Sequence, residues 1–243
     1  MVEGDAFNLA DNDIHIWDGM IRCSRDTLCS LVRLLSPDEQ KRANRFRFDI
    51  DQKRYILGRA GLRMLLARYL KREAHALYFE YSHLGKPQLD HANNTLQFNL
   101  SHSGEFILYG FSKYREIGID VERIQALPER EAMADQILCD QERAILQSLP
   151  PSARDRAFLS FWTRKESALK AQGLGIAEAK QVDVSSLSLS TYNGGYRRLG
   201  VAGIWQFYDL NPNPNYLGAL ATTDRTSLVR ICRFSLDFEY LYS

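Results

Sequence analysis

The stretch that decides the fold of this chain is FWTRKESALK, residues 161–170. It lies inside a helix that we expect over residues 152–172. On a helix with 3.6 residues per turn, Trp162, Glu166 and Lys170 share one face, each one turn from the next. The pattern is open to two interpretations: an ordinary surface ion pair beside a core aromatic residue, or one wall of a site that handles phosphate.

The rest of the chain predicts an α+β fold made of two similar halves. Helices come first and strands follow, and this order occurs twice, so we expect halves at residues 1–115 and 116–243, each with one long helix. The other predicted helices, besides 152–172, cover residues 24–35, 36–46, 51–70, 129–138 and 139–149. The predicted strands cover residues 13–19, 76–82, 95–103, 106–112, 117–124, 181–189, 203–209, 216–222 and 227–234, and NGG at 193–195 predicts a turn.

One helix start is marked clearly by its sequence. Ser36 is a predicted N-cap, and Pro37 stands at the first helical position, where its missing N–H costs nothing. Glu39, three residues after the cap, completes a capping box, in which side chains satisfy two backbone N–H groups. We therefore expect the second helix to begin at this point.

The composition is that of an ordinary globular protein. The chain has 243 residues, of which 45% are hydrophobic and 25% charged, and its formal net charge is +1. This length allows a real core in one large domain or two small ones. Because the net charge is near zero, we expect neither nucleic acid nor a membrane as partner. Any anion site must come from local basic clusters, such as residues 41–48 and 52–63.

The cysteines and the N-terminus predict a soluble cytoplasmic protein. Cys23, Cys29, Cys139 and Cys232 are scattered, with no C-x-x-C pair and no zinc-ligand spacing to a histidine, so we interpret them as isolated reduced thiols. Residues 1–13 are acidic and have no apolar segment of the kind that a secretory signal needs. No apolar run approaches the roughly 20 residues of a membrane helix.

Two carboxylates stand close together in GIDVE, residues 118–122. On a strand, Asp120 and Glu122 point to the same face, and Ile119 and Val121 point to the other. Neighbouring acids on one face repel unless water screens them or a cation lies between them. A solvated edge strand explains the pattern as well as a cation site does.

Glu166 would add a third carboxylate from the long helix. Together with Asp120 and Glu122 it would form an incomplete shell of oxygen ligands, which Mg²⁺ favours when water and phosphate complete it. Lys165 and Lys170 would then serve the negative charge of a substrate. The ordinary alternative is a helical ion pair between Glu166 and Lys170, which contributes about 0.3–0.5 kcal/mol.

A cluster of hydrogen-bond donors occurs in FNLSHSG, residues 98–104. Ser101 and His102 end a strand, and their donors beside backbone N–H groups suit a phosphate oxygen, although a self-satisfied polar turn is also possible. A Ser–His nucleophilic pair is disfavoured because adjacent strand residues point to opposite faces and no G-x-S-x-G is present. In GKP, residues 85–87, Lys86 stands in a rigid turn and either grips a nucleotide or lies on the surface.

Four motifs together resemble those of a known family. K-P, F-N-L-S-H-S, G-I-D-V-E and F-W-x-x-K-E-S-x-x-K, in this order and spacing, are similar to those of the 4′-phosphopantetheinyl transferases of the Sfp class, over roughly residues 36–176. The resemblance implies a monomeric, pseudo-dimeric α+β fold with the active site between its halves. It also implies Mg²⁺-dependent transfer of the phosphopantetheine arm of coenzyme A to a serine of an apo acyl or peptidyl carrier protein, with release of adenosine 3′,5′-bisphosphate.

The resemblance also implies roles for individual residues. Asp120, Glu122 and Glu166 match the Mg²⁺ ligands, and Glu166 matches the general base that deprotonates the carrier serine. Lys170 matches the lysine that holds the pyrophosphate, and Lys165 is expected to support that charge network. The residues expected to bind coenzyme A are Arg42, Arg54, Gly85, Lys86, Asn99, Ser101, His102, Asp120 and Lys170.

The carrier is expected to dock on residues 123–138, which follow the carboxylate strand directly. Apolar side chains such as Met133 and basic ones such as Arg130 could meet an acidic carrier helix, unless these apolar residues belong to the core. Three alternative functions stay open. They are a Mg²⁺-dependent nucleotide pyrophosphate hydrolase, a non-catalytic module that binds the carrier or coenzyme A, and a nucleic-acid binder supported only by the basic cluster of residues 41–63.

Overall fold

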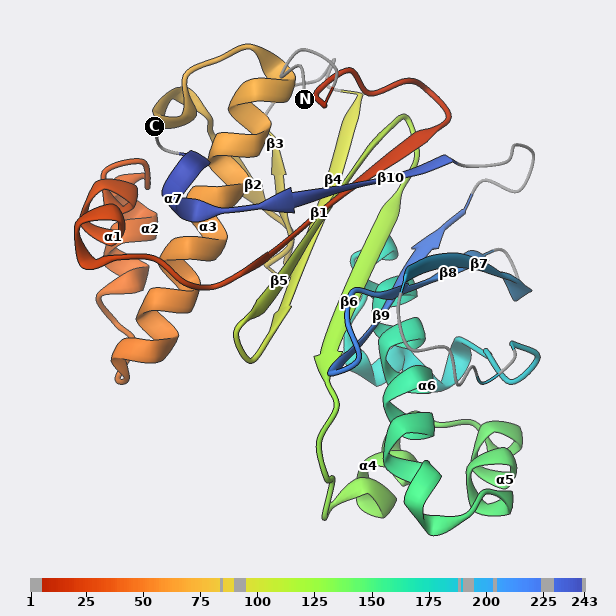
Figure 1. Cartoon of the computed structure of the whole chain (residues 1–243). Helices are drawn as coiled ribbons and strands as arrows, with labels where there is room; N and C mark the ends of the chain where they lie inside the picture. The colour runs from red at the N-terminus through yellow and green to blue at the C-terminus, as the bar shows by residue number, and fades with distance from the viewer. Residues whose placement is uncertain are drawn as a thin grey trace.

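We describe a computed structural model of the chain, shown in Figure 1. The structure describes residues 6–83, 85–89, 95–187, 189, 195–202, 205–223 and 230–241. The α+β architecture of two halves predicted from the sequence is confirmed. Among the described residues, each half combines one 22-residue helix with one four-stranded sheet.

The first half is built from β1 (Asp13–Met20), α1 (Arg25–Val32), α2 (Pro37–Ala43), α3 (Asp49–Leu70), the short 3-10 helix η1 (Ala74–Ala76), β2 (Phe79–Tyr81), β3 (Pro87–Leu89), β4 (Leu96–Ser103) and β5 (Phe106–Lys113). Its main sheet has the strand order β10-β1-β5-β4, and β2 pairs with β3 separately. The apolar side of α3, including Leu57, Leu65 and Leu66, is buried in the core of this half. The capping box of Ser36 and Glu39 is present as predicted.

The second half is built from β6 (Ile117–Arg123), α4 (Arg130–Ile137), α5 (Asp140–Ser148), α6 (Pro151–Gln172), the 3-10 helix η2 (Ile176–Gln181), β7 (Gly195–Ala202), β8 (Trp205–Asn211) and β9 (Tyr216–Thr222), with sheet order β6-β9-β8-β7. Helix α6 lies directly on β6, because Gly118 has no side chain. A Cβ added there would come within 1.9 Å of the carbonyl oxygen of Ser167. This close approach brings the face of α6 that carries Glu166 next to the carboxylates of β6.

The last strand returns to the first sheet. β10 (Arg230–Leu236) pairs in parallel with β1 and is followed by the short helix α7 (Phe238–Leu241). Arg230 pairs with Asp13, and Arg233 pairs with Asp18, both across these two strands. The division at residues 115 and 116 stays a prediction, and the sheet of the first half includes this C-terminal strand.

An apolar core between the two sheets joins the halves. It contains Ile14 and Ile16 of β1, Ile119 and Val121 of β6, and Leu220 of β9, all without exposed surface. Ile119 and Val121 were predicted to share one face of β6, and the structure confirms this, since the other half covers both side chains. No described helix is long and apolar enough to cross a membrane.

One predicted strand is wrong. Residues 181–189 were expected to be a strand, but Ile176–Gln181 is a 3-10 helix and the described residues from 182 to 187 form no strand. The physical reason is that side chains take up the backbone groups of this segment. Lys165 Nζ donates to the carbonyls of Ala179 and Val182, and Glu142 accepts from the N–H of Val184.

Other differences concern short elements. Within the predicted strand at 76–82 only Phe79–Tyr81 is extended, and the sequence did not predict β3, β7 or α7. Short strands such as β3 carry too few residues for a periodic pattern. The turn expected at residues 193–195 falls mostly outside the described residues.

Candidate active site

Side chains of β4 join the edge strands of the two sheets. Every second residue of β4 accepts a hydrogen bond from the backbone of β6, at distances of 2.8, 3.3 and 3.1 Å. The acceptors are Asn99, Ser101 and Ser103, and the donors are the N–H groups of Ile119, Val121 and Arg123, in the same order. The two strands therefore run in the same direction and are joined through the side chains of β4 rather than by backbone pairing. The carboxylates of β6 lie along this junction.

The same serines orient the two carboxylates of β6. Ser101 Oγ donates to Asp120 Oδ1 at 2.8 Å, and Ser103 Oγ donates to Glu122 Oε2 at 2.6 Å. Each hydroxyl has one proton, which it gives to a carboxylate while it accepts a backbone N–H. The positions of Asp120 and Glu122 are thus set by the other half of the molecule.

Lys170 completes the polar contacts of Asp120. Its Nζ lies 2.6 Å from Asp120 Oδ1 and 3.1 Å from Ser101 Oγ. Asp120 is 3% exposed, and its Oδ2 is buried with no hydrogen-bond partner among the described residues. A buried carboxylate oxygen without a partner is costly. It is therefore a good position for a cation to approach.

Two further carboxylates share this environment. Burial raises the pKa of Glu122, and the neighbouring Asp120 carboxylate raises it further, whereas hydrogen bonds from Ser103 and Trp162 act in the opposite direction. Burial also raises the pKa of Glu166, where Lys170 opposes the shift and Asp120 adds to it. In both groups burial is the largest cause of the shift, and the nearby carboxylate of Asp120 adds to it.

The donor set fits a magnesium ion. Asp120, Glu122 and Glu166 offer only oxygen atoms, which hard cations such as Mg²⁺ prefer, and Asp120 Oδ2 is an unused ligand atom. Two other groups of potential ligands lie closer together, Asp13 with His15 and Cys232, and Cys139 with Glu142 and Asp183. In both groups an ion pair already occupies a central carboxylate, with Arg230 on Asp13 and Lys165 on Glu142.

The structure places Lys165, for which a catalytic role was predicted, in the core of the second half and away from the carboxylates. Its side chain is fully buried, and its Nζ lies 2.8 Å from Glu142 Oε2, which is buried as well. The same ammonium donates to the carbonyls of Ala179 and Val182, so its three N–H donors are all used inside the second half. Neighbouring positions on a helix point about 100° apart, which is why Lys165 faces the core while Glu166 does not.

Lys86 reaches from the first half to the end of α6. Its Nζ donates to the carbonyl oxygens of Lys170 at 2.7 Å and Ala171 at 3.0 Å. Burial lowers the pKa of Lys86. Gly85, just before it, has φ of +82°, a conformation that favours glycine. The ammonium of Lys86 therefore holds the helix end, and the backbone of the turn faces the cavities described next.

Two adjoining cavities of about 230 and 220 Å³ run from the end of α6 to the beginning of α3. The first lies between β4, the turn at Gly85 and Lys170, and the second lies between β4, α2 and α3. They share Gly85, Pro87 and Leu100 and together form one groove, which we call the basic groove. The predicted nucleotide-binding residues that line it are Arg42, Arg54, Gly85, Lys86, Asn99, His102 and Lys170.

The basic groove is suited to phosphate groups. Arg42, Arg54 and Lys170 supply positive charge along it. His102 keeps a solvent-exposed edge, but desolvation lowers the pKa of its imidazole, and the positive charges of Lys170 and Arg54 lower it further. A neutral imidazole can donate a hydrogen bond to a phosphate oxygen without adding charge.

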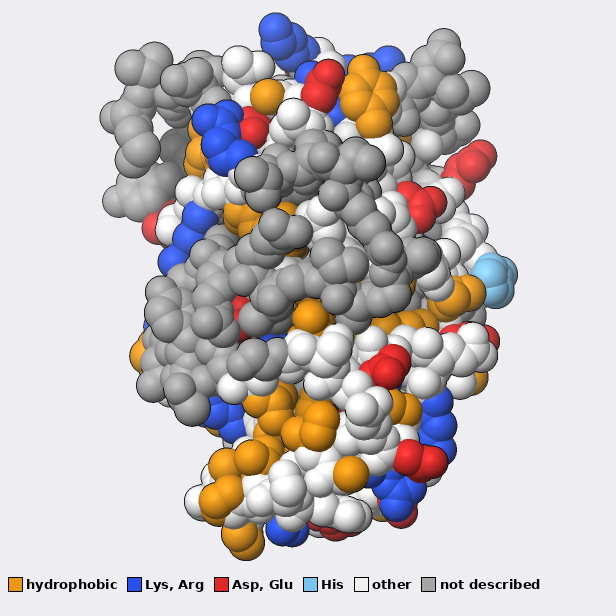
Figure 2. All heavy atoms as spheres, turned by 90° about the vertical axis from the view of Figure 1, so that its right-hand side faces the viewer, with side chains coloured by type: hydrophobic (Ala, Val, Ile, Leu, Met, Phe, Trp, Pro, Cys, Tyr) orange, Lys and Arg blue, Asp and Glu red, His pale blue; other side chains and the backbone are white. Residues whose placement is uncertain are grey.

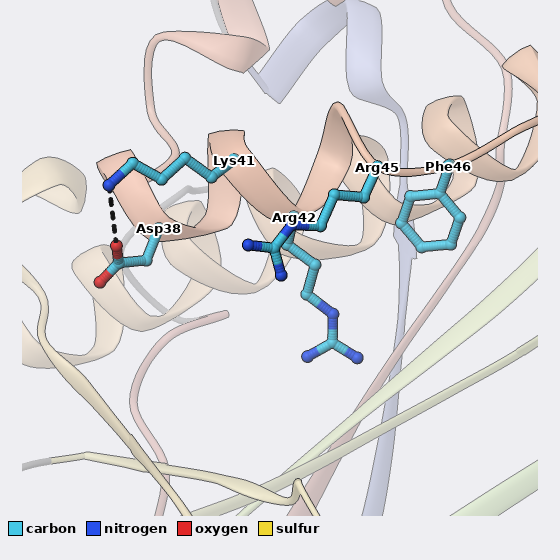
Figure 3. Close-up of a pocket in the computed structure, with 5 residues that line it drawn as sticks. All are labelled: Asp38, Lys41, Arg42, Arg45 and Phe46. Atoms are coloured by element: carbon cyan, nitrogen blue, oxygen red, sulfur yellow. Dashed lines mark ion pairs between the residues drawn. The ribbon is translucent and has the colours of Figure 1, made fainter.

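A third cavity, of about 630 Å³, lies on the outer side of α2 next to the groove. Figure 3 shows Lys41 directed toward Asp38, at 3.8 Å, while the guanidinium of Arg42 points away from this pair. Arg42 lines both this cavity and the basic groove. The outer side of α2 is therefore continuous with the nucleotide-binding region predicted from the sequence.

The structure adds two residues that the sequence analysis missed. Ser103 orients Glu122 through a hydrogen bond, and Trp162 also acts on the Glu122 carboxylate by lowering its pKa. The period of two in Asn99, Ser101 and Ser103 was a signal for Ser103, because alternate strand residues share a face. Trp162 was placed on the correct helix face but was expected only to pack.

The docking surface predicted at residues 123–138 is partly core. Ile137 is buried, Met133 is partly buried against the same core, and Arg130 forms an ion pair with Asp155. Figure 2 shows hydrophobic side chains gathering on the lower part of the molecule, where α4 and α5 lie in Figure 1. This region therefore keeps some apolar surface, although less than the sequence indicated.

Comparisons with known proteins identify the family. The N-terminal model of 4′-phosphopantetheinyl transferases matches residues 21–111, and the model of the 4′-phosphopantetheinyl transferase superfamily matches residues 116–221. The 4′-phosphopantetheinyl transferase HetI of Nostoc sp. is 34% identical over 215 residues, which are 88% of this chain and 89% of HetI. A putative 4′-phosphopantetheinyl transferase of Synechocystis sp. is 33% identical, over 77% of this chain and 79% of its own.

A further relative is the 4′-phosphopantetheinyl transferase Sfp of Bacillus subtilis, which is 27% identical over 60% of this chain and 63% of its own length. The resemblance inferred from four short motifs is thus confirmed over most of the chain. The chain belongs to the 4′-phosphopantetheinyl transferase family, whose enzymes transfer the phosphopantetheine group of coenzyme A to carrier proteins.

Proposed function

We propose that this transferase requires Mg²⁺ and carries out its reaction where the basic groove meets the carboxylates of β6 and α6. The observation that carries this proposal is the environment of Asp120. One of its oxygens is held by Ser101 and Lys170, and the other is buried without a partner among the described residues. This arrangement suits a cation placed beside a bound pyrophosphate.

Coenzyme A would lie along the basic groove. Arg42, Arg54 and His102 would bind the phosphates of its nucleotide end, and Lys170 would contact the pyrophosphate at the other end. Asn99 and Ser101 are proposed to act through β6 rather than by contact with the nucleotide, because their side-chain oxygens already accept its backbone N–H groups. The backbone of the turn at Gly85 would approach the adenine side.

Asp120, Glu122 and Glu166 would hold the ion. A bound Mg²⁺ would neutralise the developing negative charge on the phosphate oxygens. A general base is most effective when its pKa lies near the working pH, and burial raises the pKa of Glu166 toward that range. Glu166 is therefore the proposed base.

The proposed reaction is a direct displacement at phosphorus. The hydroxyl oxygen of the carrier serine bonds to the phosphorus that bears the pantetheine arm, and Glu166 takes up the hydroxyl proton. The bond from that phosphorus to the bridging oxygen breaks, and adenosine 3′,5′-bisphosphate leaves with the bonding electrons. Lys170 donates a hydrogen bond to the departing phosphate, so the residues act by positioning and charge.

We further propose that the enzyme is a monomer located in the cytoplasm. One chain supplies both walls of the basic groove, with α3 and β4 from the first half and the end of α6 from the second. A second copy is therefore not needed to complete the groove. The cytoplasmic location rests on the sequence alone.

The decisive experiment uses the purified protein, coenzyme A, Mg²⁺ and an apo acyl carrier protein, with the carrier weighed by intact mass spectrometry. We expect the carrier to gain one phosphopantetheine, about 340 Da from the formula of the transferred group. The gain should be absent without Mg²⁺ and in Glu166→Gln. If coenzyme A were cleaved equally without a carrier, the protein would instead be a pyrophosphate hydrolase, and the proposal would fail.

A further inference from the structure

The connection between α2 and α3 exposes apolar and basic side chains together. Phe46, Phe48 and Ile50 are 39%, 59% and 48% exposed, and Arg45 and Arg47, which precede Phe46 and Phe48, are exposed as well. We call these five residues the 45–50 patch. Large apolar side chains exposed next to one another on a folded surface are typical of an interaction site.

The side chains of the patch are held in place by neighbouring rings. The Phe46 ring lies 5.4 Å from the ring of Tyr55, which belongs to α3, and the Arg47 guanidinium lies 5.4 Å from the Phe48 ring. The patch also lies between two helices, one of which begins at a complete capping box. An interface that is ordered in advance loses little conformational entropy on binding.

The patch lies at the end of the molecule where the carboxylates are. Arg54 of α3 lines one cavity together with His102 of β4, and the next residue, Ser103, holds Glu122. Figure 1 shows the beginning of α3, the β4–β5 turn and the end of β6 directed toward the same lower end of the molecule. Arg42, one wall of the basic groove, also lines the cavity that Arg45 and Phe46 border.

The charge of this region is positive. Lys41 and Arg42 of α2 stand beside Arg45 and Arg47 of the patch, and these four basic residues outnumber the two exposed acids of residues 38–50, Asp38 and Asp49. A partner that covers this surface should therefore be acidic and should offer apolar side chains to the three exposed ones. Since the chain as a whole carries a net charge of only +1, this positive charge is a local feature.

We infer that the 45–50 patch is the docking surface of the first half for the carrier protein, which would place there an acidic helix with exposed apolar side chains. The inference rests on the proposed function, because a carrier serine can reach the carboxylates only if the carrier covers the surface around the groove. Aromatic and arginine side chains are enriched among the interface residues that contribute most to binding.

The test compares one apolar and one charge variant with matched controls. Phe48→Asn removes the exposed ring, and because Phe48 is the N-cap of α3 without a side-chain cap bond, asparagine suits the position. Its control is Tyr114→Asn. Tyr114 is 67% exposed and directly follows β5, at the end of that strand away from the β4–β5 turn. Its φ of 61° is a conformation that asparagine tolerates. Arg47→Glu reverses a charge, with Lys180→Glu of η2 as control.

We expect Phe48→Asn and Arg47→Glu each to raise the KM for the apo carrier about tenfold. The KM for coenzyme A, the kcat and the thermal unfolding midpoint should match those of the wild type. Both control variants should keep the wild-type KM for the carrier. Direct binding of the apo carrier, followed by calorimetry without coenzyme A, should weaken by the same factor.

Three results would overturn the inference in distinguishable ways. If the wild type transfers the group and both patch variants keep its KM for the carrier, the docking surface lies elsewhere. If the wild type modifies no apo carrier, the proposed function and the inference fail together. If the patch variants instead lose binding to vesicles of anionic phospholipid and keep the KM for the carrier, the patch is a membrane-contact surface.

Discussion

Lys86 Nζ donates a hydrogen bond of 2.7 Å to the backbone carbonyl of Lys170, and so a turn of the first half holds the end of the long helix of the second. The carbonyls at a helix C-terminus carry partial negative charge and have no partner within the helix. An ammonium group satisfies two of them here. Because Lys86 and Lys170 both line the basic groove, the contact fixes the walls of the groove at this end.

We predict that Lys86→Met lowers the free energy of unfolding by about 1–3 kcal/mol, because two carbonyls lose a charged donor. The KM for coenzyme A should also rise, since the turn at Gly85 lines the groove. Urea unfolding and initial-rate kinetics measure the two effects. Lys180→Met, a change of an exposed lysine, is the control, and equal stabilities of the two variants would contradict the role of Lys86.

Ser103→Ala tests how Glu122 is positioned. Loss of the 2.6 Å hydrogen bond should leave Glu122 less well oriented, so the Mg²⁺ concentration for half-maximal rate should rise about tenfold. Mg²⁺ binding measured by calorimetry without substrate should weaken in parallel. Ser103→Thr keeps the hydroxyl and should restore both values, and a failure of threonine to do so would leave only a structural role for Ser103.

Lys165→Met distinguishes a structural role of the buried Lys165–Glu142 pair from the catalytic role predicted for Lys165. Removal of one partner from a buried ion pair costs about 3–5 kcal/mol, since Glu142 would keep an unpaired charge. We expect a large fall in stability and an unchanged kcat for the folded fraction. The double variant Lys165→Met with Glu142→Leu should recover part of the stability. A variant of native stability with a reduced kcat would return Lys165 to the active site.

His15 predicts how stability depends on pH. It is 2% exposed on β1, with Nδ1 at 2.7 Å from Tyr69 Oη, and burial lowers its pKa from 6.5 to about 4. The folded pKa lies below the unfolded one, so between pH 6.5 and about 4 the unfolded chain binds the proton more tightly. The neutral His15 side chain therefore contributes about 3 kcal/mol to the free energy of unfolding. This contribution is complete above pH 6.5 and is lost as the pH falls toward 4.

The measurement for His15 is urea unfolding at several pH values between about 7.5 and 4.5, compared with His15→Gln. This range runs from above the unfolded pKa of 6.5 down toward the folded pKa of about 4. The glutamine can still hydrogen-bond to Tyr69 and does not titrate. The variant should lose less stability than the wild type over this range. Parallel curves for the two proteins would show that His15 is not the group responsible.

Much of the candidate site could be predicted from the sequence because its residues sit on regular elements. The period of two places Asp120 and Glu122 on one face of a strand, and the period of 3.6 places Glu166 and Lys170 on one face of a helix. The four motifs in order then identified the family. These predictions needed only local geometry and the order of the motifs.

Contacts between distant parts of the chain were decided by the tertiary structure alone. Lys165 and Glu166 are neighbours with similar polarity, and only the packing of α6 on Gly118 determines that one faces the core and the other the carboxylates. The exposed apolar residues of the 45–50 patch likewise could not be distinguished from core residues, since the sequence does not show which apolar side chains other parts of the chain will cover. A local pattern determines which residues share a face, whereas the partner of that face depends on the path of the whole chain.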